Sequence, residues 1–346
     1  MGATASFGLA NVTLATSGVA ANIDIFDTTQ YMSAEYTITA TIENTSIRQM
    51  SKVLVTGASG LLGTEFCRQL KAAGHEVWAI DNQSRSTEIP ECDTWIVTDL
   101  KNPDVFQNVL ANDFDYIYHY GAINGTTNFY ERPNEVLKTN FVSDLNIFEF
   151  ASQCPNLKRI VYASSSEVVS DDPTSPVPEN TDIMIKNIHN ARWSYRLAKV
   201  TSENFLANSK LPYVMLRYFN VYGENSKQGH FLGDQINKIK NGVFSVIGAQ
   251  ETRSFCHVSD AVRASIYVAE HCNRELVNIG NDREITIGEA VQIIAQELGH
   301  TDAVFEQLPS KAGSVANRRP NIDRLRSIMP DYEPISFEQG IRQILA

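Results

Sequence analysis

Tyr195 and Lys199 have the residue types and the spacing in this chain that best suit proton transfer. The stretch around them is predicted to be helical, and side chains at positions i and i+4 share one helix face. A neighbouring ammonium favours the phenolate and so lowers a phenol pKa that starts near ~10. We therefore expect Tyr195 to act as a base near neutral pH, although the same spacing is common on surface helices.

A cluster of serines that ends in an acid precedes this pair. Ser164, Ser165, Ser166 and Glu167 follow the apolar run 159–163, which predicts a strand. Polar side chains just beyond the C-terminal end of a parallel strand lie where open α/β sheets bind ligands. Glu167 is thus a candidate catalytic acid or base, and its alternative is a strand-end carboxylate paired with a cation.

A glycine-rich turn lies near the start of this pattern. Residues 53–55 form a short apolar run, the sequence from Gly57 to Gly63 reads G-x-x-G-x-x-G, and an amphipathic segment follows to Leu70. Glycines let the backbone turn tightly and approach a pyrophosphate, whose charge is stabilised at the helix N-terminus. The segment predicts a dinucleotide-binding loop, although glycines alone are weak evidence because turns use glycine in any case.

Two acids at predicted strand ends strengthen this interpretation. Asp81 ends the run 76–80, close to the ~20 positions after the first glycine at which an acid binds the ribose hydroxyls. Such a carboxylate favours NAD and repels the 2′-phosphate of NADP, and nearby Arg85 would weaken that preference unless it is a solvated loop charge. Asp99 ends the run 95–98 and is predicted either to touch the adenine edge or to cap its strand.

The composition limits the class of protein. The chain has 346 residues, 43% of them hydrophobic, and a net charge of −11, which argues against a general nucleic-acid binder because that needs a basic face, but does not forbid a local basic pocket for one diphosphate. We find no apolar run that would span a membrane and no basic start of a secretory signal. The five cysteines lack a C-x-x-C pair and predict reduced thiols in a cytoplasmic protein. No metal site is predicted.

The first 49 residues differ in composition from the rest of the chain. They are rich in Ala, Thr, Ser and Asn, and one run, 38–42, alternates like a half-exposed strand. We hypothesise that Met50 is the natural first residue of the catalytic unit. The expected parts are an appendage of unknown role at 1–49, an NAD-binding Rossmann domain at 50–220 and a mainly substrate-binding domain at 221–346.

The ordered motifs after Met50 resemble those of the extended short-chain dehydrogenase/reductases, and among these the NAD-dependent nucleotide-sugar epimerase/dehydratase family. The matching segments are 56–63 (TGASGLLG), Asp81, Asp99, 119–122 (HYGA), 164–167 (SSSE), Tyr195 with Lys199, 217–223 (RYFNVYG), 253–260 (RSFCHVSD), 278–280 (NIG) and 319–321 (RPN). The resemblance implies an α/β fold: a Rossmann doubly wound parallel sheet with a smaller, partly interleaved C-terminal substrate domain. It also implies tightly bound NAD and a homodimer joined through helices that include the Tyr195 segment.

Carried onto matching positions, the resemblance assigns roles to individual side chains. Tyr195 takes the proton of the sugar 4-hydroxyl while a hydride passes to the nicotinamide, Lys199 holds the nicotinamide ribose, and Ser165 hydrogen-bonds the same sugar oxygen. The implied NAD site comprises Gly57, Ser59, Gly60, Leu61, Leu62, Gly63, Asp81, Asn82, Asp99, Leu100, Tyr120, Gly121, Ala122, Tyr195 and Lys199. The implied site for a nucleoside-diphosphate sugar comprises Thr126, Ser165, Ser166, Asn220 and Arg253. Asn220 and Arg253 match diphosphate-binding positions, and their alternatives are a turn residue and a surface ion pair.

Glu167 bears on the reaction that follows oxidation at C4. In a 4,6-dehydratase this carboxylate can remove the C5 proton that the 4-ketone acidifies. Dehydratases and UDP-glucuronate decarboxylases resemble the chain at this position, whereas simple 4-epimerases usually lack the acid. Ser166 stands where one dehydratase pattern has Asp, which weakens the case for elimination, although a dehydratase subfamily acting on GDP-mannose resembles the chain in having Ser there. We rank epimerase and dehydratase together, ahead of decarboxylase.

Three departures from the family pattern flank the expected pocket. Val169 and Ser170 replace Tyr-Gly, Glu224 replaces a proline, and Tyr120 replaces a smaller residue. They leave two rival hypotheses open: a reductase of a small carbonyl compound that consumes NAD(P)H, and a non-enzymatic NAD-binding protein. The intact serine, tyrosine and lysine favour the enzyme.

Overall fold

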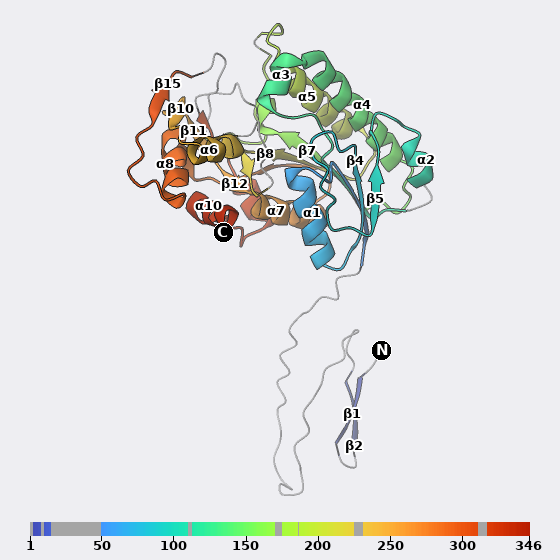
Figure 1. Cartoon of the computed structure of the whole chain (residues 1–346). Helices are drawn as coiled ribbons and strands as arrows, with labels where there is room; N and C mark the ends of the chain where they lie inside the picture. The colour runs from blue at the N-terminus through green and yellow to red at the C-terminus, as the bar shows by residue number, and fades with distance from the viewer. Residues whose placement is uncertain are drawn as a thin grey trace, which may run out of the picture. The chain divides into compact units, whose positions relative to one another are not determined.

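The computed structural model describes residues 3–7, 10–14, 50–109, 113–169, 175–185, 187–224, 231–310 and 317–346. The chain divides into two compact units, residues 1–47 and residues 48–346. In the first unit, strands β1 (Ala3–Phe7) and β2 (Ala10–Leu14) pair antiparallel (Figure 1). The strand expected at 38–42 and the substituted Ser170 lie outside the described residues.

The second unit is built on a parallel sheet of seven strands in the order β13-β8-β7-β6-β3-β4-β5. Its strands are β3 (Lys52–Thr56), β4 (Glu76–Asp81), β5 (Thr94–Val97), β6 (Tyr116–His119), β7 (Arg159–Ser165), β8 (Tyr213–Tyr218) and β13 (Glu275–Ile279). The chain proceeds outward from β3 to β5 and then returns to β6 on the other side of β3. This is the doubly wound order predicted, and such sheets bind ligands at the switch between β3 and β6.

Helices cover both faces of this sheet. Val53 and Val55 pack with α1, α7 and α9 on one face, whereas Leu54 packs with α2, α4 and α5 on the other. Burial on both faces explains why the strands read as continuous apolar runs. The helices are α1 (Leu61–Ala72), α2 (Val105–Val109), α3 (Thr126–Glu131), α4 (Pro133–Ala151), α5 (Trp193–Asn208), α6 (Phe231–Lys240), α7 (Val258–His271), α8 (Ile287–Glu297), α9 (Asp323–Ile328) and α10 (Phe337–Leu345), with a 3₁₀ turn η1 (Ser166–Val169).

The C-terminal part has its own apolar cluster, to which α6, α8 and α10 contribute Leu232, Ile294 and Ile341. Its short strands are β9 (Val221–Tyr222), β10 (Ser245–Ile247), β11 (Thr252–Ser254), β12 (Cys256–His257), β14 (Glu284–Thr286), β15 (Glu306–Leu308) and β16 (Asn317–Arg318). They form the small sheets β10-β15, β14-β11-β16 and β12-β9. Strand β13 follows several of these strands in the chain yet joins the large sheet beside β8. The two parts therefore interleave, as predicted, while the domain boundary at residue 220 stays a prediction.

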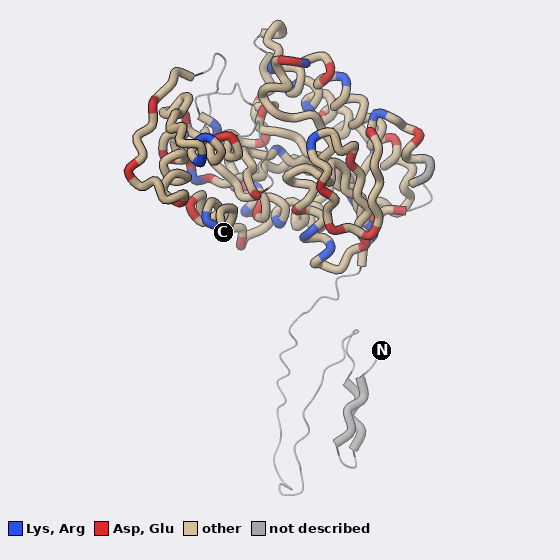
Figure 2. Tube along the Cα trace, viewed as in Figure 1, with Lys and Arg blue, Asp and Glu red and all other residues tan. Residues whose placement is uncertain are grey.

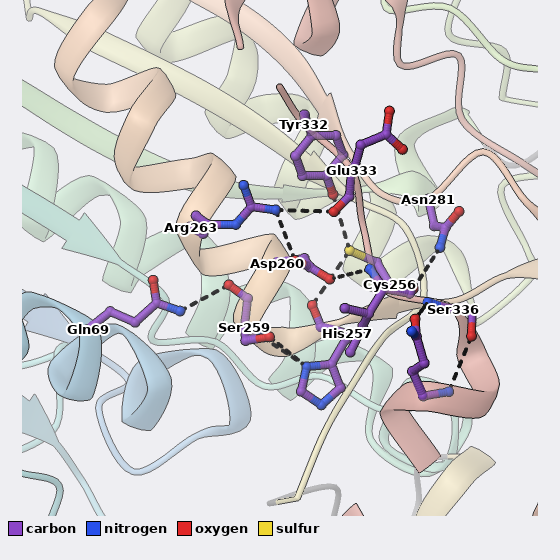
Figure 3. A network of polar contacts seen from close by, with 12 residues as sticks. Gln69, Cys256, His257, Ser259, Asp260, Arg263, Asn281, Tyr332, Glu333 and Ser336 are labelled. Atoms are coloured by element: carbon purple, nitrogen blue, oxygen red, sulfur yellow. Dashed lines mark hydrogen bonds and ion pairs between the residues drawn. The ribbon is translucent and has the colours of Figure 1, made fainter. Parts of the chain in front are cut away.

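A polar network at the start of α7 connects the helices on one face of the sheet with the C-terminal segment (Figure 3). Asp260 accepts hydrogen bonds from Arg263 at 3.0 Å and from the backbone N–H of Ile335 at 2.9 Å. Gln69 of α1 donates to the carbonyl of Ser259 at 2.9 Å. The network therefore fixes α1, α7 and the segment before α10 relative to one another.

The charges of the second unit are mixed. Figure 2 shows Lys and Arg interspersed with Asp and Glu along its helices and loops. Within the described ranges, no helix combines the length and the apolar character needed to cross a bilayer. The described His, Cys, Asp and Glu side chains form no group of three that would suit a metal ion.

Candidate active site

A cavity of about 620 Å³ opens at the C-terminal ends of β3, β4, β6 and β7. Each residue predicted for the NAD site lines it: Gly57, Ser59, Gly60, Leu61, Leu62, Gly63, Asp81, Asn82, Asp99, Leu100, Tyr120, Gly121, Ala122, Tyr195 and Lys199. So do Thr126, Ser165, Ser166, Glu167 and Asn220. Arg253 instead lines a second cavity of about 290 Å³, to which Asn220 also contributes. Apart from Arg253, the cofactor and sugar residues predicted from distant segments thus share one space.

The glycine loop at this cavity needs glycine for steric reasons. Gly57 has a φ of +68°, and a Cβ there would lie 2.6 Å from the carbonyl of Tyr120. A Cβ on Gly63 would overlap the carbonyl oxygen of Gly57. Asp81 braces the loop from β4, because its carboxylate accepts a hydrogen bond from the backbone N–H of Ser59 at 3.1 Å. Helix α1 begins here with no acid in its first turn, so its N-terminus suits a pyrophosphate and the residues fit NAD.

Tyr195 lies on α5 with its ring stacked on Phe129, at 4.8 Å between the centroids. Burial raises the pKa of its phenol well above the ordinary value, and a hydrogen bond with the Ser165 hydroxyl acts in the opposite direction. The ammonium of Lys199 lies 5.9 Å from the centre of the Tyr195 ring. The expectation that Lys199 lowers the phenol pKa stays a prediction, because burial is the largest cause of the shift in this structure.

Lys199 is almost fully buried at the floor of the cavity. Its ammonium lies 3.9 Å from a carboxylate oxygen of Asp144 and 4.5 Å from the ring centre of Tyr162. Burial lowers the pKa of Lys199, and the negative charges of Asp144 and Glu203 oppose this shift. Tyr195, Lys199 and the serine cluster all face the cavity of the glycine loop, which is the arrangement that the enzymatic interpretation requires.

Glu167 is held between two arginines that the sequence did not single out. Arg192 donates to both carboxylate oxygens, at 2.6 and 2.9 Å, and Arg318 donates to Oε1 at 2.7 Å. Burial alone would raise the pKa of Glu167, but the charges and hydrogen bonds of Arg318 and Arg192 outweigh it and hold the pKa far below its ordinary value. Glu167 is therefore a fixed anion and a weak base, as in the ion-paired alternative recognised in the sequence.

The two predicted diphosphate residues are engaged within the protein. Asn220 has a φ of +41° and donates to the carbonyl of Ser254 at 3.0 Å, so it is a turn residue at the cavity edge. Arg253 forms an ion pair of 2.8 Å with Glu251. Burial lowers the pKa of Arg253, and the positive charge of Arg318 adds to this shift. Both side chains lie beside cavities, and their contact with a diphosphate stays a prediction.

Sequence comparison defines the class of protein to which this fold and site belong. The chain is a member of the NAD-dependent epimerase/dehydratase family, whose sequence profile matches residues 53–280. The predictions of this family, of an NAD-dependent enzyme and of a Rossmann fold are thereby confirmed.

Individual proteins resemble this chain over most of its length. The chain is 30% identical over 318 residues to UDP-N-acetyl-alpha-D-glucosaminuronate decarboxylase of Bacillus cytotoxicus, which covers 85% of this chain and 96% of that protein. It is 27% identical to UDP-glucuronic acid decarboxylase 1 of Danio rerio, covering 87% of this chain and 73% of that protein. Among solved structures, UDP-N-acetylglucosamine 4-epimerase of Methanobrevibacter ruminantium superposes with a TM-score of 0.76 at 26% identity, covering 86% of this chain and 97% of that one.

Proposed function

We propose that this protein transiently oxidises C4 of a nucleoside-diphosphate uronate and releases the C6 carboxylate as CO₂. The observation that carries the proposal is the double ion pair of Glu167 with Arg192 and Arg318 at the cavity wall. Two decarboxylases of UDP-linked uronates among the relatives support it. The order of preference from the sequence, which ranked decarboxylation third, is thus changed by the surroundings of one carboxylate.

The first half of the reaction uses the predicted catalytic set. Bound at the glycine loop and Asp81, NAD would supply a reversible hydride acceptor for C4. The phenolate form of Tyr195 accepts the proton of the C4 hydroxyl while Ser165 holds the same oxygen by a hydrogen bond. Lys199 supplies the positive charge that favours this phenolate before it accepts the proton, and that charge must offset the burial that raises the phenol pKa. The product of this half is a 4-keto sugar, on which the later steps depend.

The state of Glu167 bears on the choice between elimination and decarboxylation. A 4,6-dehydratase needs a base that removes the C5 proton, and a carboxylate with a strongly lowered pKa is a poor base. A 4-keto uronate needs no such base, because it is a β-keto acid and its C5–C6 electron pair can enter the ketone. The pairing of Glu167 with Arg192 and Arg318 therefore favours decarboxylation over elimination.

The atoms and electrons of the decarboxylation balance without any further reactant except a proton from solvent. The C5–C6 bond breaks, CO₂ leaves, and the electron pair forms the enolate of the C4 ketone. A proton from solvent then adds at C5, the hydride returns to C4, and Tyr195 returns its proton to the C4 oxygen. Each turnover consumes one proton, releases one CO₂ and leaves NAD unchanged.

Arg318 also gives a reason for selecting an acidic sugar. A guanidinium binds a carboxylate with two parallel hydrogen bonds, which adds geometric specificity to charge. Arg318 and Glu167 line the cavity that Ser165 and Tyr195 share. In the proposal the C6 carboxylate shares the guanidinium group of Arg318 with Glu167, while Asn220 and Arg253 hold the diphosphate.

One experiment separates the candidate reactions. The protein is incubated in deuterated water with UDP-glucuronate, UDP-N-acetylglucosaminuronate, UDP-glucose, UDP-N-acetylglucosamine, dTDP-glucose and GDP-mannose, and products are analysed by mass spectrometry and NMR. We expect loss of CO₂ and deuterium at C5 with the uronates alone. Inversion at C4 of a neutral sugar, loss of water from C6, or steady consumption of NADH would each refute decarboxylation and identify the epimerase, dehydratase or reductase instead.

We also propose that the protein is a cytoplasmic homodimer joined through α4 and α5. These helices pack against each other and each leaves a large apolar side chain exposed: Leu137 on α4 is 37% exposed and Phe205 on α5 is 41% exposed. Single exposed apolar side chains are common on protein surfaces, so the proposal rests on the family resemblance, and these two residues are where it can be tested. The five unpaired cysteines are consistent with a reducing compartment.

A further inference from the structure

A buried carboxylate that the proposed reaction does not use lies behind Lys199. Asp144, on α4, is 0% exposed. The hydroxyls of Tyr162 and Ser202 each donate to its Oδ2 at 2.7 Å, and Nε2 of His119 lies 2.8 Å from its Oδ1. The ammonium of Lys199 is 3.9 Å from Oδ2. Three neutral hydrogen-bonding groups and one cation therefore surround this side chain.

The contacts of His119 determine its tautomer. The hydroxyl of Thr56 accepts hydrogen bonds from the backbone N–H groups of Tyr120 at 3.2 Å and Gly121 at 3.3 Å, so its own proton points to Nδ1 of His119, 2.7 Å away. Nδ1 accepts, and the ring proton is on Nε2, which donates to Asp144. Burial lowers the pKa of His119, which keeps the ring neutral. The carboxylate thus remains the anion of the network.

The other acid near Lys199 is already balanced. Glu203 accepts two hydrogen bonds from Arg217, at 2.9 and 2.7 Å, and a further one from Ser164. Arg217 is itself buried and carries the opposite charge. A buried ammonium needs a partner anion, because burial without one favours loss of the proton. Among the described residues, Asp144 is the carboxylate closest to meeting that need.

We propose that Asp144 is a positioning residue that keeps Lys199 protonated and fixed in place, and that Thr56 and His119 orient this carboxylate. The groups that face Asp144 come from every element packed against it: His119 from β6, Tyr162 from β7, and Ser202 and Lys199 from α5. Thr56 directly precedes the glycine loop, so the network connects the dinucleotide site with Lys199. The inference rests on the proposed function only for the catalytic role of that lysine.

The direct test measures the charge of Lys199 by ¹³C NMR of its Cε carbon in lysine-labelled holoenzyme, with the signal assigned through Lys199→Met. Asp144→Asn keeps the size of the side chain and removes the charge, so we expect the pKa of Lys199 to fall by about one unit or more, a tenfold change in protonation. Ser202→Ala and Tyr162→Phe are the matched controls, since each removes one neutral hydrogen bond to the same carboxylate. An unchanged pKa in Asp144→Asn, or an equal shift in a control, would overturn the proposal.

Turnover gives a second readout. In Asp144→Asn the alkaline decline of kcat should begin about one pH unit lower than in the wild type, because Lys199 loses its proton earlier. KM should change little, since Asp144 does not line the cavity. An unshifted pH profile would contradict the role. A shifted lysine pKa without turnover of any uronate would refute the proposed reaction and leave the role of Asp144 standing.

A stability comparison covers the case in which Asp144→Asn fails to fold. Lys199→Met leaves Asp144 as a buried anion without its cation, whereas the double variant with Asp144→Asn removes both charges. We expect the double variant to unfold at a higher urea concentration than Lys199→Met alone. An equal or lower midpoint would show that the two charges are not coupled and would overturn the proposal.

Discussion

Glu167 and Asp144 are both buried carboxylates beside cations, but they differ in how closely the cation binds and in whether they line the cavity. Glu167 is bound directly by two guanidinium groups at 2.6 to 2.9 Å, and it lines the cavity. Asp144 lies behind the cavity, and its cation, Lys199, is at 3.9 Å. The first acid therefore shapes the charge that a substrate meets, whereas the second acts on the lysine.

Tyr195→Phe tests the catalytic base at the residue scale. The phenyl ring can keep its stacking on Phe129, so the fold and NAD binding should be retained. The hydroxyl that moves the proton is lost, and we expect kcat to fall about 10²- to 10⁴-fold. Tyr267→Phe, which changes a tyrosine on α7 outside the cavity, is the control. Unchanged turnover in Tyr195→Phe would assign the proton transfer to another group.

Glu167→Gln tests the ion pair that directs the proposed reaction. The substitution leaves Arg192 and Arg318 buried without their anion, so the free energy of unfolding should fall by about 3–5 kcal/mol. Because the pKa of Glu167 is lowered in the folded state, its contribution is complete above about pH 5 and is lost as the pH falls through the folded-state pKa. The difference between wild type and variant should therefore shrink as the pH is lowered.

Urea unfolding at a series of pH values measures this difference. Glu297→Gln is the control, because its partner Arg342 is 63% exposed and the surface pair should contribute under about 1 kcal/mol. A Glu167→Gln variant as stable as the wild type at pH 7 would contradict the buried ion pair.

Sequence patterns located part of this site. Three of its parts are local motifs: the glycine loop, the serine cluster, and Tyr195 with Lys199. Each can be recognised from a few neighbouring residues alone. The partners of Glu167 could not be located in this way, since Arg318 is 151 residues away along the chain and reaches Glu167 only through the tertiary fold. Asp144 reads as an ordinary acid on a helix until its burial is known. The phenol pKa likewise depends on burial, which no spacing reveals.

At the scale of elements, the large sheet was predictable for a physical reason. Strands β3, β4 and β7 contain the apolar runs recognised in the sequence, because a parallel strand buried on both faces must be apolar throughout. The strands of the C-terminal part have two or three residues, such as Val221–Tyr222 in β9, which is too short for any periodicity. Their pairing is set by tertiary contacts with α6, α8 and α10.

Gly63→Ala tests how the strand–turn–helix element holds the cofactor. A Cβ there would overlap the Gly57 carbonyl oxygen and lie 2.6 Å from Cα of Ala58, so the loop must shift. We expect NAD affinity to fall at least about tenfold and stability to fall by about 1–3 kcal/mol. Gly242→Ala is the control: a Cβ meets nothing within 4 Å, so only its φ of +72° costs about 1 kcal/mol. Normal NAD binding by Gly63→Ala in calorimetry would argue against this loop as the pyrophosphate site.

At the scale of the whole molecule, the proposed dimer predicts a response to charge on α4 and α5. Leu137→Glu together with Phe205→Glu should convert the dimer to a monomer, because two acids would be buried at the interface. Light scattering after size-exclusion chromatography measures the mass directly. Val304→Glu, at a residue that is 87% exposed outside these helices, should leave the mass unchanged. A wild-type protein that is already a monomer at micromolar concentration would refute the proposed dimer.

The second compact unit holds what an independent enzyme needs. Residues 48–346 contain the seven-stranded sheet, its apolar clusters on both faces and the cavity of about 620 Å³. The family profile also lies within this unit, at residues 53–280. A chain that starts at Met50 should therefore fold by itself, bind NAD with the affinity of the full chain and unfold at the same temperature. Parallel calorimetric titration and thermal unfolding of the two proteins measure this. An insoluble or inactive protein starting at Met50 would mean that the first 49 residues belong to the catalytic unit, against the division inferred from their composition.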